Sequence, residues 1–193
     1  MKVLLSGNQA IARGAYEAGV AVATAYPGTP STEILETIAS YDGIYAEWSP
    51  NEKVALEVAM GASIAGSRAL ACMKHVGVNV AADSLMSVSY TGVNGGLVLV
   101  SADDPGCWSS QNEQDNRQFA RFARIPCLDP SDSQDAKDFT KAAFDLSEQF
   151  DTPVMLRTTT RICHTSTLTE VGTRRERPIN IEKYPRNPKK YVM

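Results

Sequence analysis

The chain has 193 residues, of which 43% are hydrophobic and 21% charged, and this predicts one well-buried globular domain followed by a tail. The formal net charge is −3, but residues 173–193 hold seven Lys or Arg against two Glu, a local +5 that leaves −8 for the preceding body. An acidic body excludes nucleic acid as an expected partner.

Membrane segments and metal motifs are also missing from the sequence. No segment approaches the ~18 apolar residues of a membrane-spanning helix, and the apolar run after Met1 is too short for a secretory signal. The four cysteines form no Cys-x-x-Cys pair, so they predict no zinc, iron–sulfur or dithiol site. We therefore expect a cytoplasmic protein with no membrane contact and no metal ligands of its own.

Short apolar runs alternate with helical patterns along the chain. The runs predict strands at 2–6, 20–25, 44–48, 68–73, 96–101, 125–128 and 153–158. The patterns between them predict helices at 8–18, 30–40, 50–65, 77–91, 112–123 and 134–149. Such alternation is typical of βαβ units and predicts a doubly wound α/β fold, with a mainly parallel sheet of six to seven strands and helices on both faces. After Arg161 the alternation stops and we expect coil.

Two predicted helices follow a hydroxyl residue and a proline. Thr29-Pro30 and Ser49-Pro50 each offer an N-cap side chain and a proline at the first helical position. Both turns are expected at the carboxyl edge of the sheet, where open α/β folds bind their ligands. Ser49 and Glu52 also have the spacing of a capping box, which favours a purely structural role for Glu52.

The common nucleotide motifs are absent. No Gly-x-Gly-x-x-Gly follows the first predicted strand, and no glycine-rich loop ends in Gly-Lys-Ser/Thr. Neither His75 nor His164 has a second metal ligand at helical spacing. His75 does follow a predicted strand at the expected ligand edge, so it is a candidate for contact with a substrate.

Four motifs, taken in order, resemble one enzyme family. They are Tyr26-Pro27-Gly28-Thr29-Pro30-Ser31-Thr32, Asn51-Glu52-Lys53-Val54-Ala55-Leu56-Glu57, Lys74-His75-Val76-Gly77 and Ser110-Gln111-Asn112-Glu113-Gln114-Asp115. Their order and spacing closely resemble the α subunit of indolepyruvate:ferredoxin oxidoreductases and, more broadly, the pyrimidine-binding domain of thiamine-diphosphate-dependent 2-oxoacid:ferredoxin oxidoreductases. The resemblance covers almost the whole chain, and it implies the thiamine-diphosphate-binding fold and oxidative decarboxylation of a 2-oxoacid to an acyl-CoA.

The resemblance also implies residue roles. Glu52 matches the acidic residue that bonds N1′ of the cofactor's aminopyrimidine and so helps to activate C2 of the thiazolium ring. Thr29 matches the threonine that lies beside the substrate carboxylate. Pro27 and Gly28 belong to the same turn and are expected to contact the cofactor, and His75 is kept as a second substrate-binding candidate.

The chain departs from the family pattern near the predicted strand 96–101. Pyruvate-specific relatives place an arginine after this strand to pair with the substrate carboxylate, whereas this chain has Asp103 and Asp104. Arg117 could pair with the substrate carboxylate instead, but nothing in the sequence indicates this role. A larger aromatic substrate, indolepyruvate or another aryl pyruvate, suits the change.

The other half of the family's active site is missing. The Gly-Asp-Gly segment that holds Mg²⁺ and the diphosphate is absent, and so are the iron–sulfur cysteines. The resemblance therefore implies a half-site that needs a diphosphate-binding domain of the same or another subunit, a second, β-type subunit, and ferredoxin. Iron–sulfur clusters and coenzyme A belong only to the complete enzyme, which we expect to be a homo- or hetero-oligomer.

Residues 1–170 are predicted to form the pyrimidine-binding α/β domain, and residues 171–193 a basic, proline-containing linker or tail. An apolar, partner-facing surface is expected around residues 50–66 and 77–92. Two rival interpretations stay open at this point. One is a non-catalytic assembly domain in which Glu52 is only a cap, and the other is a nucleotide- or flavin-binding α/β module.

Overall fold

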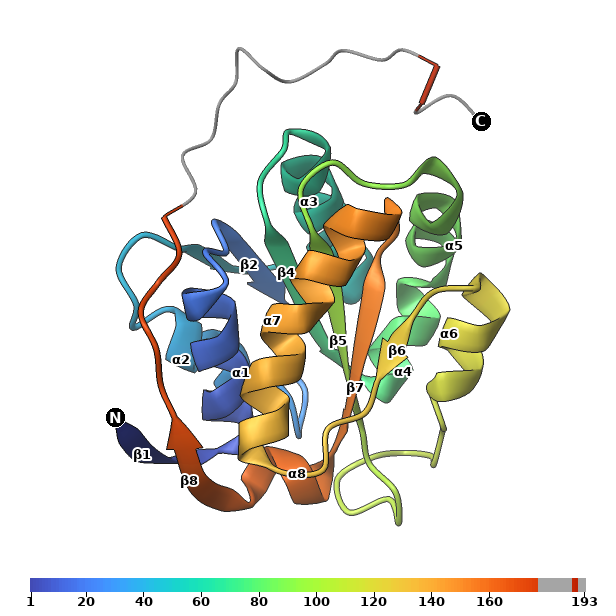
Figure 1. The fold of residues 1–193 in the computed structure, drawn as a ribbon. Helices are drawn as coiled ribbons and strands as arrows, with labels where there is room; N and C mark the ends of the chain where they lie inside the picture. The colour runs from blue at the N-terminus through green and yellow to red at the C-terminus, as the bar shows by residue number, and fades with distance from the viewer. Residues whose placement is uncertain (177–188, 191–193) are drawn as a thin grey trace.

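The computed structural model describes residues 1–176 and 189–190, and its centre is a parallel six-stranded sheet (Figure 1). The strand order is β3-β2-β4-β5-β7-β6, and every neighbouring pair is parallel. The bounds are β2 Val22–Ala25, β3 Tyr45–Trp48, β4 Ala69–Lys74, β5 Leu97–Asp103, β6 Cys127–Leu128 and β7 Val154–Thr159. The prediction of a doubly wound, mainly parallel sheet is confirmed.

Helices cover both faces of this sheet (Figure 1). One apolar cluster joins it to α1 Gly7–Glu17, α2 Thr32–Ile38 and α7 Ser133–Phe150. A second cluster joins the opposite face to α3 Glu52–Ile64, α4 His75–Val80, α5 Ala82–Thr91 and α6 Arg117–Ala123. Because β4 and β5 lie between two helical layers, their apolar residues are buried on both sides, which explains their unbroken apolar runs.

The first predicted strand is not part of the main sheet. β1 Lys2–Ser6 pairs antiparallel with β8 Ser166–Glu170 and forms a separate two-stranded sheet. The expectation of coil after Arg161 was wrong, because α8 Thr160–His164 and then β8 occupy this stretch. The partner of β8 lies at the other end of the described chain, so no local pattern indicated the pairing.

Four of the predicted helices also differ from the structure. The helix expected at 77–91 is two helices that meet at Ala81. The helix expected at 112–123 begins only at Arg117, because residues 104–116 form a loop that hydrogen-bonds back to the sheet. The helices expected to begin at 30 and 50 begin at Thr32 and Glu52.

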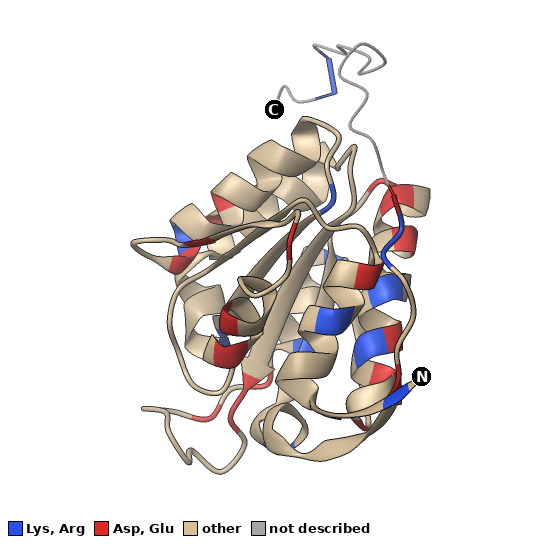
Figure 2. Cartoon of the chain, turned by 90° about the vertical axis from the view of Figure 1, so that its left-hand side faces the viewer, with Lys and Arg blue, Asp and Glu red and all other residues tan. Residues whose placement is uncertain are grey.

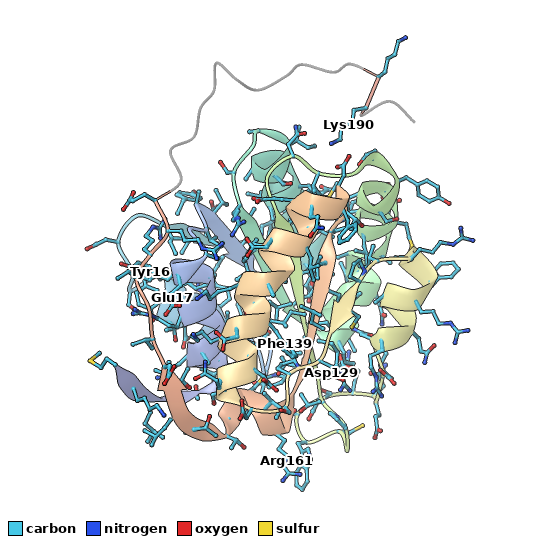
Figure 3. All side chains as sticks on the ribbon, in the orientation of Figure 1. Tyr16, Glu17, Asp129, Phe139, Arg161 and Lys190 are labelled. Atoms are coloured by element: carbon cyan, nitrogen blue, oxygen red, sulfur yellow. The ribbon has the colours of Figure 1, made fainter. Side chains whose placement is uncertain are left out.

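A buried carboxylate ties α1 to α7. Glu17, labelled in Figure 3, is fully buried. It accepts hydrogen bonds from Arg13 at 3.0 Å and Lys141 at 2.9 Å. Burial alone would raise its pKa, but bonds from Gly172 and these cations lower the pKa of Glu17 below its ordinary value. Blue and red bands alternate along the helices beside the N-terminus in Figure 2, so these helix surfaces carry mixed charge rather than one basic patch.

The predicted boundary near residue 170 stays a prediction. Residues 171–176 run along α1, where the Arg175 amide donates to the Glu17 carbonyl oxygen at 3.0 Å. The predicted tail lies mostly outside the described residues, which omit 177–188 and 191–193. Within the part of the chain that is described, no helix has the length and apolarity to cross a membrane.

Candidate functional site

The sequence-predicted site residues meet at one place on the carboxyl edge of the sheet. The chain runs from β2 to β3 on one side and from β4 to β5 on the other, so adjacent β2 and β4 flank the point where the winding reverses. Crevices at such points are the usual ligand sites of open α/β sheets. The turn at 26–31 follows β2, Glu52 comes shortly after β3, and His75 directly follows β4.

Glu52 is the first residue of α3, and its side chain does not cap the helix. The N-cap is Asn51, whose Oδ1 accepts a hydrogen bond from the Val54 amide at 2.9 Å. The predicted Ser49–Glu52 capping box is therefore wrong. The box needs Glu52 at the third helical position, but α3 begins at Glu52, so Ser49 lies two residues before the N-cap and its amide donates to the Ala25 carbonyl at 2.8 Å.

The half-buried Glu52 side chain lies against Gly77 of α4. A Cβ atom on Gly77 would stand 2.6 Å from Glu52 Cγ and 2.7 Å from Glu52 Oε1, well inside van der Waals contact. No described residue hydrogen-bonds to the Glu52 carboxylate. The carboxylate is thus held in place by packing while its acceptor capacity remains available to a ligand.

The turn after β2 exposes Thr29. The Ser31 amide donates to the Gly28 carbonyl at 2.9 Å, so Thr29 and Pro30 are the middle residues of a turn, and the peptide bond between them is cis. The prediction that Thr29 caps α2 is wrong, because the helix begins after this turn and its N-cap is Ser31. The Thr29 hydroxyl makes no hydrogen bond to a described residue, and Pro27 beside it is exposed.

Gly28 makes close contact with the end of β4. The position of a Cβ on Gly28 is 3.1 Å from Lys74 Cδ, and Lys74 Nζ donates to the Ser109 carbonyl at 2.9 Å. Lys74 therefore bridges the turn after β2 and the loop of residues 104–116. These contacts bring that loop to the edge of the predicted site.

His75 lies beneath the same loop and is fully buried. Its Nε2 is 2.9 Å from Asn112 Oδ1 and 3.1 Å from the Asn112 carbonyl oxygen, and two acceptors at one nitrogen place the proton on Nε2. The His75 carbonyl accepts from Asn116 Nδ2 at 3.0 Å. Nδ1 has no partner among the described residues. The ring thus holds the loop, and its role as a substrate contact stays a prediction.

A buried ion pair supports the loop, and the sequence analysis missed it. Arg157 Nε donates to Asp103 Oδ2 at 2.8 Å, and the Asn116 amide donates to the same oxygen at 3.0 Å. Burial raises the pKa of Asp103 above its ordinary value, although these hydrogen bonds act in the opposite direction. An arginine inside the apolar run of β7 was the available signal, because a buried guanidinium needs a carboxylate partner.

Asp104 joins the middle of the loop to the start of α8. Its Oδ2 accepts from the Ser109 amide at 2.7 Å and the Ser110 hydroxyl at 2.8 Å, and its Oδ1 accepts from Thr160 Oγ1 at 2.7 Å. Burial acts to raise its pKa, but the bonds from Thr160, Ser109 and Ser110 outweigh it and hold the pKa of Asp104 below its ordinary range. The two acids at the end of β5 are therefore structural, and Arg117, which pairs with Asp115 at 2.8 Å, is already engaged.

The chain is similar to known proteins over most of its length. Residues 13–193 match the family described as pyruvate flavodoxin/ferredoxin oxidoreductase, thiamine diphosphate-binding. The indolepyruvate oxidoreductase subunit IorA of Pyrococcus horikoshii is 54% identical over 99% of this chain, and that of Archaeoglobus fulgidus is 53% identical over 100%. A 2-oxoglutarate synthase subunit, KorA of Methanothermobacter thermautotrophicus, is 31% identical over 79% of the chain.

A solved structure supports the fold. The 2-oxoglutarate:ferredoxin oxidoreductase of Magnetococcus marinus, described with 2-oxoglutarate, coenzyme A and succinyl-CoA bound, superposes with a TM-score of 0.79 and 18% identity, over 90% of this chain and 33% of that one. This chain spans about a third of the length of its curated relatives, since it covers 31% of the Pyrococcus horikoshii protein and 32% of the Archaeoglobus fulgidus protein.

Proposed function

Because the chain belongs to the family of thiamine-diphosphate-binding domains of pyruvate flavodoxin/ferredoxin oxidoreductases, we propose that it forms the pyrimidine-binding half of the active site of a 2-oxoacid:ferredoxin oxidoreductase. The proposed substrate is indolepyruvate or another aryl pyruvate, which the complete enzyme decarboxylates oxidatively to an acyl-CoA. The names of the relatives that are 53–54% identical support this substrate class.

One observation carries the proposal: the Glu52 carboxylate at the winding reversal has no hydrogen bond to a described residue and lies over a glycine that leaves room for it. Such a carboxylate fits the N1′ atom of an aminopyrimidine. Thiamine diphosphate, when bound, supplies the acidic C2 carbon that adds to the 2-oxo group and accepts the electrons of decarboxylation. Glu52 would share its proton with N1′ and so act as the acid–base group of the site.

The neighbouring residues would bind and orient. The exposed Thr29 hydroxyl can donate a hydrogen bond to the substrate carboxylate, and the turn at Pro27 and Gly28 would contact the cofactor beside it. His75 is buried and hydrogen-bonds to Asn112. These contacts favour a role in holding the loop of residues 104–116 rather than direct contact with the substrate. The turn follows the buried strand β2 and His75 begins α4 directly after β4, so regular elements support each of these groups.

The rest of the site must come from elsewhere. We propose that a diphosphate-binding domain of the same or another subunit supplies the ligands of Mg²⁺ and the diphosphate, and that a β-type subunit, iron–sulfur clusters and ferredoxin complete the enzyme. Exposed apolar side chains on the predicted partner-facing helices, Val58, Val80 and Tyr90, are 40%, 50% and 88% exposed and support such an interface.

The test is Glu52→Gln in the complete enzyme, with Glu57→Gln as the control. Both glutamates lie on α3, but Glu57 is exposed and bonds to Ser84. We expect Glu52→Gln to lower turnover about 10²- to 10⁴-fold, to slow hydrogen–deuterium exchange at C2 of bound thiamine diphosphate in parallel, and to leave the fold unchanged. Full turnover and exchange in Glu52→Gln would favour the assembly-domain alternative.

A further inference from the structure

A second hollow lies on the carboxyl edge, beside the turns already described. It has a volume of about 520 Å³ and is lined by Pro105, Trp108, Thr159, Thr160 and Arg161. Its walls are the loop after β5 and the start of α8, and Figure 3 shows Arg161 at the lower end of the molecule, beyond the strand ends. Volumes of about 300–1,000 Å³ are typical of small-molecule sites.

Trp108 presents an indole ring to this hollow. It is 82% exposed, and its Nε1 edge rests 3.1 Å from where a Cβ of Gly106 would stand. Gly106 and Cys107 have positive φ values of 86° and 54°, a conformation that costs a non-glycine residue energy. A loop that turns sharply to expose its largest aromatic side chain provides a stacking surface for another flat ring.

Arg161 is the free cation of the hollow. Its side chain is exposed, and no hydrogen bond or ion pair joins its guanidinium to any described residue. The neighbouring cations are already engaged, Arg157 with Asp103 and Lys74 with the Ser109 carbonyl. A guanidinium at a ring face is attracted by the π system, most strongly for an indole.

Asp104 fixes the two walls relative to each other. Its carboxylate is 1% exposed and bonds at once to the Ser109 amide, next to Trp108, and to the Thr160 hydroxyl, next to Arg161. No ion pair joins this carboxylate to Arg161, and three of its acceptor positions are used within the protein. The hollow is preformed rather than assembled on binding, which lowers the entropic cost of ligand capture.

The hollow is within reach of Thr29. The Lys74 side chain lies between them, because a Cβ built on Gly28 would stand 3.1 Å from Lys74 Cδ and Lys74 Nζ donates to the Ser109 carbonyl at 2.9 Å. One lysine side chain thus separates the turn that carries Thr29 from the loop that carries Trp108. An arylpyruvate is an elongated molecule, with its carboxylate and its ring at opposite ends, so its two ends can contact two neighbouring segments at once.

We propose that the hollow between Trp108 and Arg161 receives the aromatic side chain of the 2-oxoacid while the carboxylate stays at Thr29. Trp108 stacks on the ring and Arg161 lies against its face, so the pocket selects electron-rich aryl groups over alkyl groups. This inference rests on the proposed function, since it names the part of that site which recognises the side chain.

The test measures kcat/KM of the complete enzyme for indolepyruvate, phenylpyruvate and 2-oxobutyrate. We expect Trp108→Ala to lower the value for indolepyruvate about ten- to hundredfold and to leave 2-oxobutyrate unchanged, with Trp108→Phe between wild type and Trp108→Ala. Arg161→Gln should lower indolepyruvate several-fold more than 2-oxobutyrate. Phe150→Ala is the control, because Phe150 is 60% exposed but ends α7 at the opposite edge of the sheet.

Direct binding separates this inference from the proposed function. Phenylpyruvate should quench tryptophan fluorescence in the wild type and do so less in Trp108→Phe, whether or not the enzyme turns over. An enzyme that shows this quenching but oxidises no 2-oxoacid would refute the proposed function and support an aryl-acid pocket. Equal losses of kcat/KM for all three substrates would overturn the inference, because they would assign the hollow to domain assembly. A rise only in the KM for coenzyme A would also overturn it, because it would assign the hollow to a nucleotide.

Discussion

Replacing Gly77 with alanine tests how the fold positions Glu52. The new Cβ would stand 2.6 Å from Glu52 Cγ, and ordinary contact begins at 3.4 Å, so the side chain must move by the difference, about 0.8 Å. Catalytic groups need to be held within about 0.5 Å of their working position, and misplacement by about 1 Å can cost ~10²-fold in rate. We expect Gly77→Ala to lower kcat/KM of the complete enzyme about 10- to 100-fold.

The effect on stability has two opposing contributions. Overpacking a fitted contact costs typically ~1–3 kcal/mol, whereas alanine in a helix is favoured over glycine by up to ~1 kcal/mol. Gly77 is buried at the contact, so we expect a net loss of about 1–2 kcal/mol in the free energy of unfolding, measured by urea denaturation. Gly61→Ala on α3 is the matched control, because a Cβ there would meet no atom within 4 Å.

A double-mutant cycle gives the decisive comparison. Glu52→Ala removes the Cγ, Cδ and Oε1 atoms that the new methyl group would strike. In that background, Gly77→Ala should be neutral or slightly stabilising. If it costs as much stability there as in the wild type, the contact with Glu52 is not what requires glycine at residue 77, and the positioning argument is wrong.

Three further predictions concern the loop and the half-site. Arg157→Met leaves Asp103 buried without its cation, which should cost about 3–5 kcal/mol of unfolding free energy. Because the raised pKa of Asp103 favours its neutral form in the folded state, this cost should grow as pH rises from 4 to 7, and a pH-independent cost in urea titrations would contradict the assignment. Asp104 has a lowered pKa, so its contribution to the free energy of unfolding is complete above about pH 4 and is lost as pH falls further. Asp104→Asn should lower the free energy of unfolding at pH 7 by ~1–2 kcal/mol. In a series of thermal-unfolding measurements, this variant should also show a smaller fall of Tm at acid pH. The isolated chain should bind thiamine diphosphate with Mg²⁺ only weakly, and micromolar affinity by calorimetry would reveal a phosphate site of its own.

The local chemistry of the chain was enough to predict the layers and the edge at which the site lies. Apolar runs such as 68–73 and 96–101 became β4 and β5, because a strand covered on both faces needs apolar residues at every position. The carboxyl ends of parallel strands share one edge, so residues that follow different strands, Thr29, Glu52 and His75, were expected to lie near one another. Their chemical roles came from the family resemblance and remain proposals.

Only the tertiary structure decided which local options were used. Ser49 and Asn51 are both good N-caps by type, and the structure shows that α3 begins directly after Asn51, two residues beyond Ser49, whose amide bonds to the Ala25 carbonyl of the neighbouring strand. The same holds for β1, which had an adequate strand pattern but pairs with β8 at the far end of the described chain.

The contacts that position the site residues could likewise not be predicted from the sequence. The Glu52–Gly77 contact and the Asp104–Thr160 bond each join residues from different elements. A glycine or an aspartate occurs in many local structures, so the residue types at 77 and 104 do not predict which side chains these residues contact. Such contacts depend on how helices and loops pack on the sheet in three dimensions, whereas residue type and spacing report only the structure of one segment at a time.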